Sequence, residues 1–207
     1  NHGSIIWSGD VFISATGQLV NQTDGRMDLR SGSLSPAVEG QSILTLENHG
    51  LVEKTQASVF PFGLNISVAN TGSLDLLTGT VEATRSIATD GTVNIATDAQ
   101  LTVTGATFLQ TAGTTTLTGG ALFSDRVIDL QGGVFTGIGT VNASIRNAAL
   151  LRPGNPFGLM IITKDYTQTS TGILAEKIAG PVAGVGYGQL RVQGGITLAG
   201  SILLEPL

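Results

Sequence analysis

The stretch Gly72-Ser-Leu74-Asp-Leu76, closed by the turn Thr78-Gly79, contains the pattern that decides the fold. A glycine opens a short segment in which apolar and polar residues alternate, and a second turn ends it. Alternation with a period of two is typical of strands that bury one face. The same phrase recurs at Gly25-Arg-Met27-Asp-Leu29, Gly91-Thr-Val93-Asn-Ile95 and Gly113-Thr-Thr115-Thr-Leu117.

Seven glycines mark this repeat, in steps of 22, 25, 22, 19, 22 and 20 residues: Gly3, Gly25, Gly50, Gly72, Gly91, Gly113 and Gly133. A period of this length with internal alternation is typical of a β-solenoid. One turn of short strands cannot bury its apolar face alone, whereas stacked turns bury a continuous core. We therefore predict an all-β fold, a right-handed parallel β-helix with rungs of about 20–25 residues and these glycines at structural turns.

Asparagines accompany the repeat glycines. Asn48 and Asn70 each lie two residues before a repeat glycine, as do Asn1, Thr89 and Thr111. Asparagine tolerates the left-handed backbone of tight turns. Stacked asparagines also exchange amide hydrogen bonds along the axis of a cross-β stack. We predict that Asn48 and Asn70 form such a ladder.

The alternation also predicts the core and two interruptions. The inward-facing side chains are expected to include Ile5, Trp7, Met27, Leu29, Leu44, Leu46, Leu74, Leu76, Val93, Ile95, Leu101, Val103 and Leu117. Ser33 to Ser42 and Thr55 to Leu64 break the period and are interpreted as loops that leave the solenoid. Phe60 and Phe62 in the second loop are a candidate contact patch for sugar or protein. The alternative is that they fold back over an end or side of the solenoid.

Composition excludes several classes of protein. Only 12% of the 207 residues are charged, the net charge is −5, and the ten Lys and Arg are scattered. Without a basic stripe, the chain is not expected to bind nucleic acid or an anionic membrane surface. There is no cysteine, and no apolar run is long enough for a membrane-spanning helix.

Candidate chemical groups are few. His2 and His49 lie in Asn-His-Gly turns, and two histidines without cysteine predict neither a metal site nor a cofactor. Some parallel β-helices cleave polysaccharides with paired acids on adjacent rungs. The candidate acids here are Asp24 with Asp28, Asp75, Asp90 with Asp98, and Asp125 with Asp129 and Arg126. Because none forms a dense motif, we interpret them as turn or surface residues and predict no catalytic residue.

The last 60 residues resemble a known family. They contain Leu151-Arg-Pro153-Gly154-Asn-Pro, then Asp165-Tyr-Thr-Gln168, then Gly188-Gln-Leu190-Arg-Val, then Gly195-Ile-Thr-Leu198-Ala-Gly200. This order resembles the end of the passenger region in bacterial autotransporter-type surface adhesins. The resemblance implies a parallel β-helix, export to the cell surface, and a role in adhesion or scaffolding. It divides the chain into repeats at 1–147 and a passenger-end-like segment at 148–207.

The resulting prediction is a structural segment of a bacterial cell-surface or extracellular protein: an adhesin, stalk or filament. The opening Asn1-His-Gly3 repeats Asn48-His-Gly50, so we expect a piece of a longer parent chain. Expected partners are flanking domains, other copies end to end, and host or matrix glycans. The competing prediction is a polysaccharide-binding module, or a polysaccharide lyase or glycosidase, on the same fold.

Overall fold

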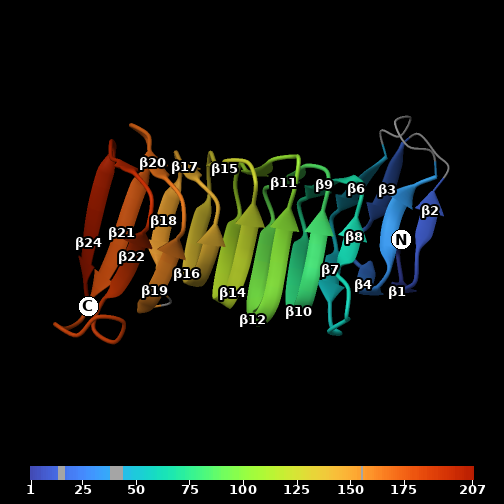
Figure 1. Ribbon diagram of the computed structural model, residues 1–207, viewed down its shortest axis with the longest axis horizontal. Helices are drawn as coiled ribbons and strands as arrows, with labels where there is room; N and C mark the ends of the chain where they lie inside the picture. Colours follow the sequence, from blue (N-terminus) through green and yellow to red (C-terminus); the bar gives the residue numbers. More distant parts are fainter. Residues whose placement is uncertain (14–16, 38–43, 155) are drawn as a thin grey trace.

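The strands of the protein wind into one elongated stack, with the N-terminus at one end and the C-terminus at the other (Figure 1). The computed structural model describes residues 1–13, 17–37, 44–154 and 156–207. Every described element is a strand, and every pairing between the named strands is parallel. The predicted parallel β-helix is therefore confirmed.

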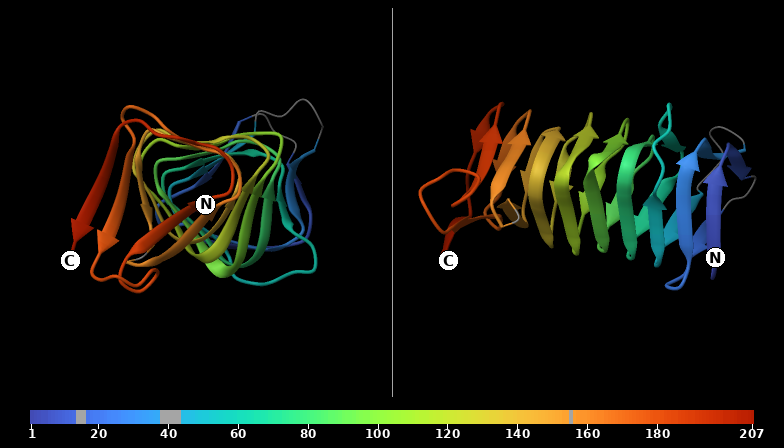
Figure 2. Two further views of the ribbon diagram at one scale, coloured as in Figure 1. Left: turned by 60° about the vertical axis from the view of Figure 1, so that its left-hand side comes forward. Right: turned by 90° about the horizontal axis from the view of Figure 1, so that it is seen from below.

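The strands form three columns that run along the stack (Figure 2). The first column contains β1 (Ser4–Ser8), β4 (Arg26–Ser31), β7 (Leu51–Lys54), β10 (Ser73–Ala83), β12 (Thr92–Val103), β14 (Thr114–Ser124), β16 (Val134–Asn142), β18 (Leu150–Pro153), β21 (Ile173–Ile178) and β24 (Ser201–Pro206). The second contains β2 (Val11–Ile13), β5 (Ser33–Pro36) and β8 (Phe62–Leu64), then the second halves of the long strands β10 to β16, then β19 (Gly158–Ile162) and β22 (Gly188–Val192).

The third column is a separate nine-stranded sheet among the described residues. Its members are β3 (Gln18–Asn21), β6 (Thr45–Asn48), β9 (Ser67–Asn70), β11 (Ile87–Thr89), β13 (Phe108–Gln110), β15 (Ile128–Leu130), β17 (Ile145–Asn147), β20 (Tyr166–Gln168) and β23 (Ile196–Thr197). Each strand pairs with the strand one rung away, so the chain closes a rung before it starts the next.

The core runs between the three columns, where inward-facing side chains stack on those of the next rung. Leu74 pairs in register with Val52 on one side and Val93 on the other. Of the thirteen predicted inward residues, eleven are buried, while Ile5 and Trp7 are half-buried and pack against the core. Thr115 is a polar exception, since it is fully buried between Val93 and Phe135.

Both predicted loops include residues that the structure places in strands. Ser33–Pro36 forms β5 and Phe62–Leu64 forms β8, and Leu34 pairs with Leu64 inside the core. The sequence pattern missed these strands because each is only three or four residues long and offers one or two inward positions. The first prediction also includes residues 38–42, which lie outside the described residues. The second loop is reduced to 55–61.

The sheets run without interruption across the predicted boundary between residues 147 and 148. β18 pairs with β16, and β20 pairs with β17, in the same parallel sense as the earlier rungs. The C-terminal segment thus consists of further rungs of one solenoid. Within the described ranges, no helix is long and apolar enough to cross a membrane.

Candidate functional site

The repeat glycines form a single backbone column along the axis. In each case the residue after one repeat glycine donates its backbone N–H to the carbonyl oxygen of the repeat glycine before it, as from Thr92 to Gly72 at 2.8 Å. A Cβ placed on Gly72 or Gly91 would collide with the backbone of the preceding rung. Gly72 and Gly91 do not have a positive φ, so close packing between rungs requires the glycine. Gly113 and Gly133 combine the close packing with a positive φ.

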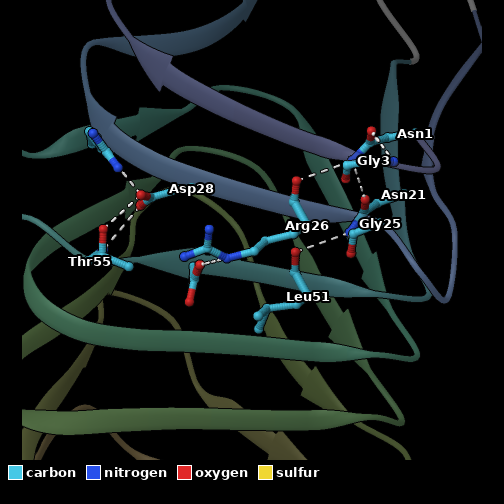
Figure 3. A network of polar contacts seen from close by, with 10 residues as sticks. Asn1, Gly3, Asn21, Gly25, Arg26, Asp28, Leu51 and Thr55 are labelled. Carbon is cyan, nitrogen blue, oxygen red and sulfur yellow. Dashed lines mark hydrogen bonds and ion pairs between the residues drawn. The ribbon is translucent and has the colours of Figure 1, made fainter.

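A ladder of buried amides runs beside this column, and Figure 3 shows its first rungs. The Nδ2 of Asn21 donates to Oδ1 of Asn48 at 2.8 Å, and the Nδ2 of Asn48 donates to Oδ1 of Asn70 at 2.7 Å. Asn70 donates to Thr89 Oγ1 at 3.0 Å, and Asn1 donates to Asn21 at 2.9 Å. The predicted ladder at Asn48 and Asn70 is therefore present. Its asparagines do not use the left-handed backbone, because no described non-glycine residue has a positive φ.

Partway along the rod, asparagine is replaced at the ladder position by threonine and then by glutamine. Thr89 pairs in register with Gln110, and Thr111, which lies two residues before Gly113, is exposed one position later. Gln110 is fully buried and donates to Gly132 O at 2.9 Å. The spacing between ladder residue and glycine grows from two residues to three at this rung. A fixed offset of two residues from the repeat glycine therefore does not locate the ladder residue at this rung.

The candidate acids Asp125, Asp129 and Asp24 each have a contact of their own. Asp125 accepts a hydrogen bond from the backbone of Gly105 at 3.0 Å, whereas Asp129 pairs with Arg146 at 3.0 Å, and no contact joins the two acids in the described part of the chain. His2 contacts Asp24 at 3.0 Å across one rung. No group of three or more metal-ligating side chains occurs among the residues searched. The acids thus act between neighbouring rungs rather than around a common centre.

One charged network is buried at the base of the loop 55–61 (Figure 3). Asp28 accepts from Arg30 Nε at 2.8 Å, from Thr55 Oγ1 at 2.7 Å and from the Thr55 backbone at 3.2 Å. Burial raises the pKa of Asp28, but these hydrogen bonds and the Arg30 charge outweigh it and leave the pKa lowered. The fully buried Lys54 donates to Leu29 O at 3.2 Å and Arg30 O at 2.8 Å, and burial lowers its pKa while Asp28 raises it.

The loop 55–61 carries the most exposed aromatic side chain of the described chain. Phe60 is 78% exposed and its neighbour Val59 is 93% exposed. Phe62 is fully buried in β8, so the predicted patch of Phe60 with Phe62 does not exist as a pair. The residues of β8 alternate, and the position of Phe62 points into the core beside Leu64. Phe60 is thus exposed on the loop, whereas Phe62 is part of the core.

A hollow of about 460 Å³ lies between this loop and the second column of strands. Its walls include Val59 and Phe60 on the loop and Asp10, Ser31 and Ser33 on the rungs, over a floor that includes Gly63. Ser33 Oγ donates to Asp10 Oδ1 at 2.9 Å. We call this feature the Phe60 hollow. No sequence pattern indicates the polar wall of the hollow, because Asp10 and Ser33 come together only through the pairing of β2 with β5.

Glu176 in β21 is the described carboxyl with the largest upward shift in pKa. Its Oε2 is buried without a hydrogen-bond partner among the described residues, in a place where a Cβ on Gly188 would approach it to 2.6 Å. Burial raises the pKa of Glu176 from 4.5 to about 7. The folded state therefore holds this proton more tightly than the unfolded state does.

We expect this carboxyl to make the free energy of unfolding fall as the pH rises from about 4.5 to about 7. Over that window the folded state binds more protons than the unfolded state, so deprotonation favours unfolding. After allowance for its partial exposure, the loss is about 2 kcal/mol. Glu176→Gln should remove this slope, as measured by urea unfolding between pH 4 and pH 8. The outer-face control Glu82→Gln should retain it, and an unchanged slope in Glu176→Gln would contradict the prediction.

Comparison with known proteins finds no matching family model, no matching curated protein and no matching solved structure.

Proposed function

We propose that this chain is a rod segment of a bacterial cell-surface or extracellular protein of the passenger type, an adhesin, stalk or filament that displays loops on a stiff support. The observation that carries the proposal is the unbroken parallel ladder, in which glycine, amide and apolar columns all continue from rung to rung. Such a stack resists bending because every rung is bonded to both neighbours. The resemblance at residues 148–207 supports the exported location.

The last strand supports a continuation of the rod. β24 leaves the large apolar side chains of Ile202, Leu203 and Leu204 exposed. Exposed apolar strand edges promote pairing with another chain, so proteins cover them. We propose that further rungs of a longer parent chain cover this edge. End-to-end stacking of copies is the competing arrangement, and it would appear as concentration-dependent assembly in sedimentation velocity experiments.

The experiment for the proposed function is surface labelling of intact cells. Antibodies raised against the exposed loop 55–61 should label intact cells of the source organism, and protease treatment of those cells should remove the label. Labelling that requires cell lysis would overturn the proposal. A cytosolic marker protein, probed in the same samples, controls for leakage.

The polysaccharide-degrading alternative predicts a different result. An enzyme of that class requires two carboxyls on either side of one bond. The acids that lie in register on adjacent rungs, Asp28, Glu53 and Asp75, are each bound to a neighbouring side chain instead, to Arg30, Arg26 and Asn94 respectively. Incubation with neutral and acidic polysaccharides should therefore release neither reducing ends nor unsaturated products. Release that is lost in Asp125→Ala or Asp129→Ala would favour the enzyme.

A further inference from the structure

The loop 55–61 is braced from inside the protein although its tip is apolar and exposed. Lys54 Nζ donates to Ser58 Oγ at 3.3 Å, and Ser58 Oγ donates to Phe60 O at 2.6 Å. At the other end of the brace, Lys54 bonds to two backbone carbonyls of the preceding rung. A buried cation thus fixes the backbone at the position of Phe60. Figure 2 shows the loop, in teal, projecting from the side of the rod.

Exposure of the apolar side chains of Val59 and Phe60 to water is unfavourable, so it does not contribute to the stability of the fold. Large apolar side chains gathered at the surface mark binding sites more often than chance. Phe60 and Val59 would be free to turn inward in an unbraced loop. The buried brace therefore supports a role for the tip in contact with a partner.

The Phe60 hollow beside the tip has two chemically distinct walls. Val59, Phe60 and Pro61 are apolar, whereas Asp10, Ser31 and Ser33 supply a carboxylate and hydroxyl groups. Ser33 bonds to Asp10 Oδ1, and Asp10 Oδ2 has no hydrogen-bond partner among the described residues. The volume lies within the range of small-ligand pockets, about 300–1,000 Å³. The hollow therefore suits a molecule with one apolar face and one hydroxyl-rich edge.

Charge narrows the class of ligand further. Asp10 is the one charged residue among the described residues that line the hollow, so an anionic ligand would meet repulsion without a compensating cation. A sugar ring presents C–H groups on its face and hydroxyl groups on its edge. We propose that the Phe60 hollow binds a neutral oligosaccharide, whose ring stacks on Phe60 while its hydroxyls bond to Asp10 and Ser33.

Gly63, at the floor of the Phe60 hollow, leaves room for the proposed sugar. Residue 63 faces outward between the inward-facing Phe62 and Leu64, and its neighbours in the column are Ser33 and Glu82. Any side chain at position 63 would occupy the hollow, and its Cβ would lie 3.1 Å from Ser33 Cβ. The absence of a side chain leaves the space that a sugar ring would enter.

The inference rests on the proposed display role, but its test is independent of where the protein is located. The purified protein would be screened on an array of neutral and anionic oligosaccharides, and the strongest neutral binder would be titrated while NMR follows the Phe60 ring and the Gly63 amide. We expect saturable shifts at both groups and preference for the neutral sugar over a uronic-acid oligomer of equal length. Phe60→Ala and Asp10→Ala should each weaken binding about tenfold, whereas Phe60→Tyr should retain it.

Val185→Ala provides the matched control, because Val185 is another exposed apolar side chain and lies between β21 and β22. Circular dichroism would check that each variant folds, and we expect Phe60→Ala to fold because Phe60 is exposed. Binding to no oligosaccharide on the array, equal or stronger binding of anionic sugars, or equal loss in Val185→Ala would each overturn the inference. Failure here would leave surface labelling of the rod unaffected, so the two proposals can be separated.

Discussion

Replacing Gly91 by alanine is expected to lower the free energy of unfolding by about 3 kcal/mol. A Cβ at Gly91 would collide with the carbonyl oxygen of Gly72 and lie 2.6 Å from the carbonyl carbon of Thr71. The same Gly72 oxygen accepts the backbone hydrogen bond from Thr92. The added methyl group must therefore push two rungs apart at the point where they are bonded. The measurement is urea unfolding followed by far-UV circular dichroism.

Two other glycines separate the effect of backbone strain from the effect of the steric collision. Gly105 has a φ of +71° but open space around its Cβ position, so Gly105→Ala should cost only the backbone strain, about 1 kcal/mol. Gly3 has no positive φ, and its Cβ would lie 4.0 Å from the nearest atom, so Gly3→Ala should change little. If Gly91→Ala were no more destabilising than Gly105→Ala, the steric account of the glycine column would be wrong.

Replacing Asn48 by alanine is expected to cost about 3 kcal/mol. The substitution removes the only described donor to Asn70 Oδ1 and a donor to Ser73 O, and it removes the acceptor for Asn21 Nδ2. Asn48 and Asn70 are buried, so water cannot replace the missing partners without opening the rung. Thermal and urea unfolding would measure the loss.

Asn65 offers a matched control for this prediction. It also bonds to both neighbouring rungs, donating to Ser35 Oγ at 2.8 Å and accepting from Thr84 Oγ1 at 2.9 Å. Its side chain is half-exposed on the outer face, so water can satisfy the groups left behind. Asn65→Ala should therefore cost less than 1 kcal/mol. Equal losses in the two variants would show that burial does not set the strength of the ladder.

The repeat glycines were visible in the sequence because one residue type occupies that position in every rung from Gly3 to Gly133. The later rungs show where this signal ends. The backbone column continues through Ala149, Gly172 and Gly200, with steps of 16, 23 and 28 residues after Gly133. Alanine replaces glycine at 149, and a rung can vary in length where the chain turns between columns. A search for a fixed residue at a fixed period therefore lost the column after Gly133.

Contacts between neighbouring rungs explain what the sequence did not reveal at the candidate site. Asp28 alternates with Met27 and Leu29 and was expected to face water. The loop 55–61 begins over it, and Thr55 converts an outward carboxylate into a buried one. Lys54 is likewise buried by neighbours that lie about one rung away in the chain. Periodicity assigns a residue to the inner or outer face of its strand, but it does not show which loop of a neighbouring rung covers that face.

The strictly parallel stacking also has a consequence for how the chain folds. Each strand meets a partner about one rung away in the sequence, as when Ser73 pairs with Thr92 or Thr45 with Ser67. The length of chain that must be closed to add a rung is therefore similar along the molecule, and because the entropic cost of closure grows only slowly with length, that cost is similar too. Lengthening the molecule lowers its relative contact order rather than raising it. Once one rung has formed, it is a template for the next, and folding can advance along the axis at a rate that does not depend on the total length.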